Sequence, residues 1–268
     1  MTLRLLGTGA AEGIPAFLSS SRVSQHAREH GGKDVRTRCG ALVDGCLKID
    51  LPPDTLYHIH RDKLDTRDWT ALLLTHSHAD HFAIQELQYG VYPFNEMEYL
   101  CFSIYGNDAC CAKLRAEYPD WPLEVVETKS FQPFQHGPFA ITPIRANHLQ
   151  EEDSQNFLIE RGGKCLLYAT DTGVWEEETW SFLEGSRLDA LAIECTEGLS
   201  ATDYWGHLSA EDCVMVVERL RKMGGLSKES RVVTTHHSHN GDATHAELEA
   251  YLNPRGIEVG YDGMDVEF

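Results

Sequence analysis

The sequence predicts a single α/β domain over residues 1–268, and two observations lead to that prediction. Short apolar runs that suit buried strands alternate with helical segments in both halves of the chain. The chain also contains no low-complexity run and no linker rich in proline, glycine or serine. Its 42% hydrophobic and 24% charged residues are typical of a globular protein.

The first half begins with an apolar strand at residues 3–6. A hairpin follows over residues 41–50, because Asp44 and Gly45 form a dipeptide favoured in type I′ turns between apolar strands. Further segments then predict a helix, a buried strand, the start of a helix, a strand and a helix, at residues 55–64, 71–75, 83–87, 100–105 and 108–118.

The second half follows an irregular stretch, residues 119–138. Four segments predict a strand, a hairpin and two more strands, at residues 139–146, 156–169, 188–194 and 231–235. Ser209 and Asp212 have the spacing of a capping box, which predicts the start of a long amphipathic helix. A short helix at residues 244–251 and a closing strand with a turn at residues 258–266 complete the chain.

Three histidines and an aspartate follow the predicted strand at residues 71–75, in the order His76-x-His78-x-Asp80-His81. On an extended backbone His76 and His78 point the same way, and the next two side chains can reach a neighbouring position as the chain turns. Imidazole and carboxylate suit zinc, manganese or iron. One ion cannot easily take all four side chains, whereas two neighbouring ions can, and paired ions suit phosphoester hydrolysis.

This motif after a "LLLT" strand resembles the H-x-H-x-D-H signature of the metallo-β-lactamase superfamily. The resemblance implies an α/β fold of four layers, the αββα metallo-β-lactamase sandwich, with the metal site at one edge of its two sheets. It also implies three further ligands downstream: a third histidine, a bridging aspartate and a last histidine.

Those three ligands have candidates in this chain. His148, directly after a strand, is favoured over His136, which lies in a turn. Asp171 ends a strand and matches the bridging carboxylate, and the family's register favours His236 over His237. The resemblance thus implies two divalent ions, zinc or manganese with iron as an alternative. One ion would be held by His76, His78 and His148, the other by Asp80, His81 and His236, with Asp171 between them.

One branch of the superfamily, the phosphonate-pathway phosphoribosyl cyclic phosphodiesterases, is the most similar. In that branch a histidine of the "H-L-S" kind enters the site without being a primary ligand, and His207 matches it. The resemblance implies that His207 protonates the leaving oxygen or binds phosphate, and it gives Asp80 a catalytic role beside its role as a ligand. Glu194 is either an acceptor for a site histidine or an edge charge.

The chain departs from that branch near its N-terminus. The branch carries a C-x-C-x-x-C run that holds a structural zinc, and this chain has Ser19, Ser21 and Ser24 at the same spacing. Serine is a poor zinc ligand, so we expect no structural zinc. Whether His26, His30 and His239 form a remnant second metal site stays open at this stage.

The expected function is therefore a metal-dependent phosphodiesterase acting on a small phosphodiester, with a cyclic ribose phosphate as one option. A transfer-RNA 3′-processing nuclease shares the ligands, but it needs a basic arm. The one sizeable insertion expected here, about residues 98–138, is not basic. A non-catalytic accessory protein of pyrroloquinoline quinone synthesis is the alternative from another class.

The net charge and the cysteine content limit which partners and which cellular location we expect. A formal net charge of −19 disfavours nucleic acid as a partner. No apolar run has the length of a membrane helix and the N-terminus does not resemble a signal peptide, so a cytoplasmic protein is expected. The eight cysteines include no C-x-x-C pair and suit buried free thiols. The oligomeric state stays open, with a homodimer as one option.

Overall fold

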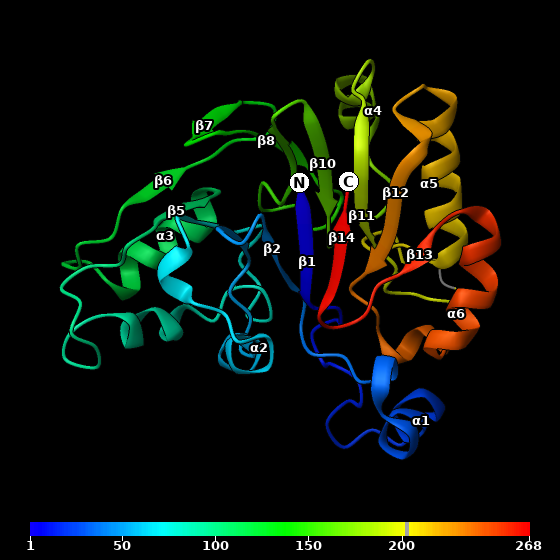
Figure 1. The fold of residues 1–268 in the computed structure, drawn as a ribbon, viewed down its shortest axis with the longest axis horizontal. Coiled ribbons are helices and arrows are strands. Elements are labelled where there is room, and N and C mark those ends of the chain that lie inside the picture. The colour runs from blue at the N-terminus through cyan, green and yellow to red at the C-terminus, as the bar shows by residue number, and fades with distance from the viewer. Residues whose placement is uncertain (202–203) are drawn as a thin grey trace.

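Two mixed seven-stranded sheets pack face to face, and helices cover their outer faces (Figure 1). The structure is a computed structural model that describes residues 1–201 and 204–268. The first sheet has the order β14-β1-β2-β3-β4-β5-β6, and the second has the order β13-β12-β11-β10-β9-β8-β7. The predicted four-layer αββα sandwich is confirmed by this arrangement.

Both sheets combine parallel and antiparallel pairs. The strands of the first sheet are β1 (Thr2–Gly7), β2 (Gly40–Val43), β3 (Leu47–Ile49), β4 (Ala71–Leu73), β5 (Ser103–Gly106), β6 (Val125–Glu127) and β14 (Met264–Glu267). The strands of the second sheet are β7 (Phe134–His136), β8 (Phe139–Arg145), β9 (Gln155–Arg161), β10 (Lys164–Ala169), β11 (Leu188–Glu194), β12 (Leu226–Thr235) and β13 (Glu258–Val259).

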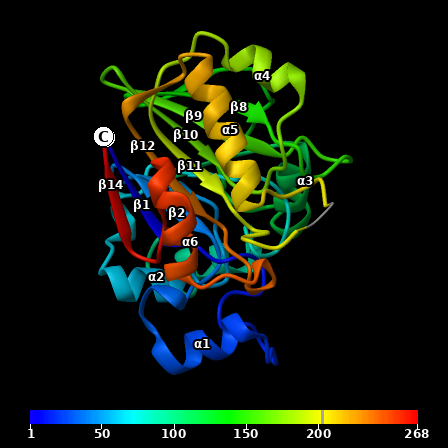
Figure 2. The ribbon, with the colours of Figure 1, turned by 90° about the vertical axis from the view of Figure 1, so that its right-hand side faces the viewer.

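Six α-helices and five 3₁₀-helices are present in the described residues. The α-helices are α1 (Arg22–His30), α2 (Thr55–Asp62), α3 (Asp108–Glu117), α4 (Glu177–Leu183), α5 (Ala210–Lys222) and α6 (His245–Leu252). The 3₁₀-helices are η1 (Gly32–Asp34), η2 (Thr66–Asp68), η3 (Ile84–Gly90), η4 (His239–Gly241) and η5 (Asn253–Arg255). Helix α5 crosses the outer face of the second sheet, with α4 and α6 beside it (Figure 2).

Strand alternation explains the layers. Leu47 and Ile49 of β3 point into the space between the sheets, where they meet residues of the second sheet such as Phe157 and Tyr168. Residues of the opposite parity face outward. Leu72 packs beneath α3, and Leu42 packs with Trp69 near α2. The outer face of the second sheet forms its own core with α4, α5 and α6.

Local predictions hold where short-range chemistry decides the structure. The 44–45 turn has Asp44 at φ 47° and Gly45 at φ 73°, the left-handed values that a type I′ turn needs. Ser209 and Asp212 form the predicted capping box of α5, each side chain bonding the other residue's backbone N–H.

The helix expected to start after the metal motif is present as the 3₁₀-helix η3, which ends at Gly90, because Gly90 and Pro93 oppose helical continuation. Two other expectations were wrong. The closing strand is two strands in different sheets, since the chain crosses between them at Gly260–Gly263. Residues 98–138 are no insertion: they contain α3 and three strands of the two sheets.

The two chain ends lie next to each other, and the Met1 amino group lies 3.1 Å from the Phe268 carbonyl oxygen (Figure 1). Among the helices of residues 1–201 and 204–268, none combines the length and apolarity needed to cross a bilayer.

Candidate metal centre

Four chain segments bring their polar residues to one edge of the sandwich, where the strands that precede them end. The loop after β4 carries His76, His78, Asp80 and His81. Strands β8, β10 and β12 run in the same direction in the second sheet, and their carboxyl ends lead to His148, Asp171 and His236. The site therefore takes residues from both sheets, at the seam between them.

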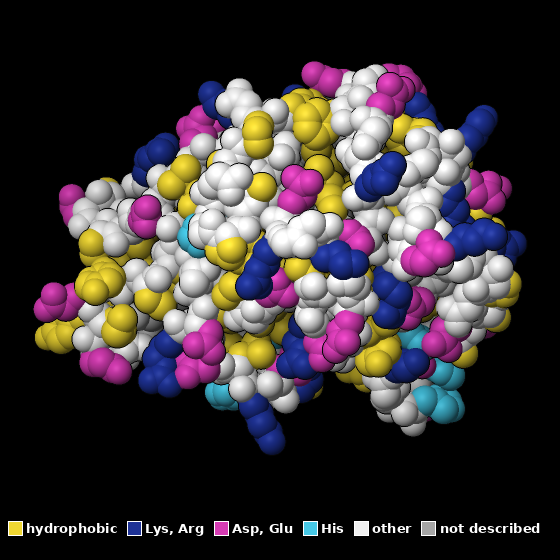
Figure 3. All heavy atoms as spheres, turned by 45° about the horizontal axis from the view of Figure 1, so that its top comes forward, with side chains coloured by type: hydrophobic (Ala, Val, Ile, Leu, Met, Phe, Trp, Pro, Cys, Tyr) yellow, Lys and Arg dark blue, Asp and Glu magenta, His cyan; other side chains and the backbone are white. Residues whose placement is uncertain are grey.

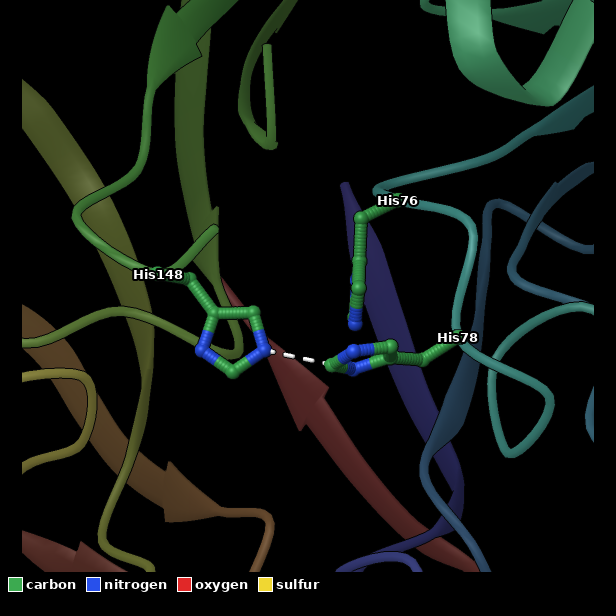
Figure 4. A group of neighbouring side chains, drawn as sticks. All are labelled: His76, His78 and His148. Carbon is green, nitrogen blue, oxygen red and sulfur yellow. Dashed lines mark hydrogen bonds between the residues drawn. The ribbon is translucent and has the colours of Figure 1, made fainter. Parts of the chain in front are cut away.

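The first group of donors is His76, His78 and His148. One ring nitrogen of each lies within 4.8 Å of the other two, and the three rings converge from the two sides of the seam (Figure 4). His78 Nδ1 lies 3.3 Å from His148 Nε2. His76 Nε2 is buried and has no hydrogen-bond partner. A buried nitrogen without a partner is costly unless a ligand satisfies it.

The second group is Asp80, His81 and His236, whose donor atoms also lie within 4.8 Å of one another. Asp171 joins the two groups. Its Oδ2 lies 2.9 Å from His81 Nε2 and 3.1 Å from His236 Nε2, and its Oδ1 faces His148 Nε2 at 3.7 Å.

Backbone strain accompanies this arrangement. Asp171 has φ 48° and His236 has φ 53°, so both adopt the left-handed conformation directly after their strands. Non-glycine residues rarely adopt it, and the cost is about 1–3 kcal/mol each. Asp50, at the end of β3, has φ 57° and lies against the same site. Strain of this kind concentrates at functional sites.

Three histidines of the two groups are oriented by a partner on the other ring nitrogen. His81 Nδ1 lies 2.7 Å from the carboxylate of Asp50, which is fully buried. His148 Nδ1 donates to the carbonyl of Gly206 at 3.1 Å, and His236 Nδ1 lies 2.8 Å from Thr196 Oγ1. Such contacts fix the tautomer of a metal-binding imidazole. Asp50 and Thr196 are not predictable from the sequence, because a carboxylate at a strand end or a loop threonine has no distinctive pattern.

His207 lies beside both groups without belonging to either. A ring nitrogen of His207 lies within 4.8 Å of donor atoms of His148 and Asp171. Its Nδ1 lies 2.8 Å from Glu194 Oε1, so Glu194 is the acceptor of a site histidine rather than an edge charge. Burial opposes charge on His207, but Glu194 outweighs burial and raises the pKa of His207 above its usual value.

The electrostatics of the two groups differ. Burial lowers the pKa of His76 well below its usual value and lowers that of His148, so both imidazoles are neutral. Burial acts the same way on His81, but the surrounding carboxylates, Asp171 first, raise its pKa well above the usual value. The second group therefore stabilises positive charge, as a proton or as a metal ion.

The two histidines that the sequence made less favoured as ligands lie outside both donor groups. His136 is in β7, where its Nδ1 bonds the Tyr105 hydroxyl at 3.0 Å. His237 is buried behind His236 with Nε2 3.3 Å from Thr234 Oγ1, and its backbone N–H donates to Thr8.

The region of the serine run is held by hydrogen bonds. His239 Nδ1 lies 3.0 Å from Ser21 Oγ, and the Ser24 hydroxyl accepts from the Ala16 N–H. The rings of His26 and His30 stack on each other along α1, 4.2 Å apart. Within the described ranges, none of these three histidines is part of a group of three possible metal donors.

The donor set fits divalent metal ions. Five imidazoles and two carboxylates meet at one seam, one buried imidazole nitrogen lacks any partner, and a carboxylate lies between two groups. These are the ligand types that zinc and related ions prefer.

Solved structures of the same fold cover the whole chain. Zn²⁺-bound PqqB from Methylobacterium extorquens superimposes with a TM-score of 0.78 at 18% identity, over 100% of both chains. A diphosphatase from the PhnP family gives 0.75 at 22% identity, over 100% of this chain and 97% of the other. The short form of human tRNase Z gives 0.67 at 17% identity, over 100% and 99%. At these identities the likeness shows the fold.

Sequence comparisons give the family. A search of curated proteins found no match. The family described as "Beta-lactamase superfamily domain" matches residues 42–237, which include His76 to His81, His148, Asp171 and His236. The match covers well over half of the chain, and the protein therefore belongs to the β-lactamase superfamily.

Proposed function

We propose that this protein is a hydrolase that uses two divalent metal ions to cleave a small phosphodiester. The observation that carries the proposal is the position of Asp171, whose two oxygens face different groups of donors. A shared carboxylate between two groups suits a pair of closely spaced ions, and such pairs serve in-line displacement at phosphorus. Zinc or manganese fits these donors, with iron as an alternative.

The distances between donor atoms divide the residues into two groups, one for each proposed ion. The first ion would be held by His76, His78 and His148, and the second by Asp80, His81 and His236, with Asp171 shared between them. When bound, the ions would supply Lewis acidity and lower the pKa of a water molecule towards neutrality. Asp80 keeps part of its side chain exposed at the solvent side of the second group. There we assign it a second role, to orient the attacking water.

His207 is the residue placed to move a proton. Its Nδ1–H donates to Glu194, which fixes the ring and leaves the other nitrogen free to protonate the leaving oxygen. Glu194 is fully buried and also accepts from the backbone N–H groups of Thr172 and Leu208, so its own position is fixed. We therefore propose His207 as the general acid and Glu194 as its positioning residue.

Two features support a small phosphodiester as the substrate. One of the similar folds is a diphosphatase of the PhnP family, and the chain matches the cyclic phosphodiesterase branch at the "H-L-S" position of His207. A nucleic-acid substrate has less support. The net charge is −19, and on the face in Figure 3 basic side chains are interspersed with acidic ones.

The test is hydrolysis of bis(p-nitrophenyl) phosphate by protein reconstituted with manganese or zinc, together with His207→Ala. We expect turnover that requires metal and falls about 10²- to 10⁴-fold in the variant, as loss of a general acid predicts. His136→Ala is the matched control, since His136 lies in β7 away from the site, and it should keep full turnover. Asp171→Ala should reduce the bound metal from two ions per chain.

Other outcomes point to other functions. Two bound ions without turnover of any diester would favour an accessory role, for which the similarity to the fold of PqqB is the supporting observation. Cleavage of precursor tRNA at physiological salt would favour the nuclease. An unchanged metal content in Asp171→Ala would contradict the shared carboxylate.

A further inference from the structure

Lys48 is buried where the sheet calls for an apolar residue. It lies in the middle of β3 between Leu47 and Ile49, and its exposed fraction is 0%. It faces the outer side of the first sheet, where its cross-strand neighbours are Leu42 and Leu72. A buried ammonium group is costly unless hydrogen bonds satisfy it. The position therefore requires an explanation that packing does not give.

The ammonium group binds the end of its own strand. Lys48 Nζ donates to the carbonyl of Ile49 at 2.9 Å and to the carbonyl of Asp50. Gly40, on β2, makes room for it, because a Cβ there would lie 3.1 Å from Nζ. Burial lowers the pKa of Lys48 to about 8, so the group remains largely protonated at neutral pH.

Those carbonyls belong to the turn that aims Asp50 at the metal centre. Asp50 has φ 57°, an unfavourable backbone conformation that the bond from Lys48 helps to hold. In this conformation the carboxylate accepts from the backbone N–H and hydroxyl of Thr75, which directly precedes the metal motif. Its other oxygen lies 2.7 Å from His81 Nδ1.

We propose that Lys48 is a positioning residue for the second metal ion, acting through Asp50 on His81. The inference rests on the proposed function, because it requires an ion at the group of Asp80, His81 and His236. Asp50 bonds His81 of the second group directly. It reaches His76 of the first group only through the Thr75 hydroxyl, which lies 3.1 Å from His76 Nδ1, so the larger effect falls on the second ion.

Lys48→Met separates this role from a role in packing. Methionine keeps the volume and the flexible stem, and its side chain suits the apolar surroundings of Leu42 and Leu72. Removal of the buried charge offsets part of the cost of leaving the carbonyls of Ile49 and Asp50 without this donor, so the melting temperature of the apo variant should change little. Loss of a residue that orients a ligand typically weakens metal affinity 10- to 100-fold.

The experiment titrates Co²⁺ and Zn²⁺ into apo wild type, Lys48→Met and Leu72→Met, followed by calorimetry and by the Co²⁺ absorption spectrum. Apo melting temperatures are measured in parallel. Leu72→Met is the matched control, because it changes the packing beside Lys48 and leaves the ammonium group in place. We expect a 10- to 100-fold weaker second site in Lys48→Met alone, with a smaller change at the first site.

The outcomes separate the two proposals. Fewer than two ions in the wild type would overturn the proposed function and the role of Lys48 with it. Two ions in the wild type and equally tight binding in Lys48→Met would overturn the role of Lys48 alone. So would equal weakening in Leu72→Met. Should Lys48→Met fail to fold, Lys48→Leu, which also removes the donor, decides: a second site as tight as in the wild type would refute the inference.

Discussion

Three buried carboxylates that are not among the expected metal ligands hold individual residues of the site in place. Asp50 orients His81, and Glu194 orients His207. Glu152 accepts from the backbone N–H and hydroxyl of Ser77, inside the metal motif. Each carboxylate has several donors, which offsets the cost of burying its charge. The histidines of the centre are thus held in place by groups that would not touch an ion.

His58 is a buried histidine whose surroundings favour the neutral form, in contrast to the charged carboxylates above. Its Nε2 lies 2.7 Å from the Thr37 hydroxyl, which itself donates to Asp262, so Nε2 carries the hydrogen. Its Nδ1 is buried without a partner. Burial, with Lys48 and Arg61 nearby, lowers the pKa of His58 to about 2.

We expect this histidine to make the apo protein less stable in acid. Because the folded pKa lies below the unfolded value of 6.5, the unfolded chain binds the additional proton. The contribution is intact above about pH 6.5 and declines as the pH falls, by about 2 kcal/mol between pH 7 and 5. Urea unfolding at both pH values measures it. His58→Gln should lose less stability over this interval than the wild type, and equal losses would contradict the assignment.

At the scale of elements, the site is built from loops that cross closely after their strands end. Gly173, two residues after Asp171, donates its N–H to the Asn147 carbonyl beside His148. The loop that carries His207 passes over Gly173, and a Cβ there would lie 1.7 Å from the Trp205 carbonyl oxygen. The same loop supplies the Gly206 carbonyl that orients His148. A methyl group at residue 173 therefore has no room unless that loop moves.

Gly173→Ala should impair catalysis by displacing the loop of His207. Overpacking of this kind costs about 1–3 kcal/mol, which lowers the melting temperature by several degrees. Diester turnover should fall at least tenfold, because general acid catalysis depends on the position of His207. Gly225→Ala is the control, since its Cβ would meet other atoms only at ordinary distances of 3.4 Å or more. Wild-type turnover in Gly173→Ala would show that the close approach of Gly173 to the Trp205 carbonyl does not position His207.

The sequence predicts the elements that carry the site only where local chemistry determines them. The motif from His76 to His81 and the capping box of α5 are visible because their spacing has a direct physical meaning. Asp50 and Lys48 are not visible, since their roles depend on which strands become neighbours. For the same reason the closing segment reads as one strand, although Gly260 to Gly263 lead the chain from the second sheet to the first.

At the scale of the whole molecule, the proposed ions would connect the two sheets. The ligands before residue 100 follow β4 of the first sheet, and His148, Asp171 and His236 follow strands of the second. In the absence of a cation, this seam holds the carboxylates of Asp80 and Asp171 among five histidines, and one buried nitrogen has no partner. Metal binding should therefore stabilise the packing of one sheet on the other as well as support catalysis.

Metal removal should accordingly lower stability in a way that depends on metal concentration. An ion that binds only the folded state adds about 2.7 kcal/mol of unfolding free energy at 100 times its dissociation constant. Differential scanning calorimetry with EDTA, and then with increasing zinc or manganese, measures the shift. His76→Ala should lose most of it, because it removes the imidazole whose buried Nε2 lacks a partner, whereas His26→Ala on α1 should behave as the wild type. A melting temperature that is independent of metal would mean that the ions do not join the sheets, and an equal loss in both variants would place the stabilising metal elsewhere.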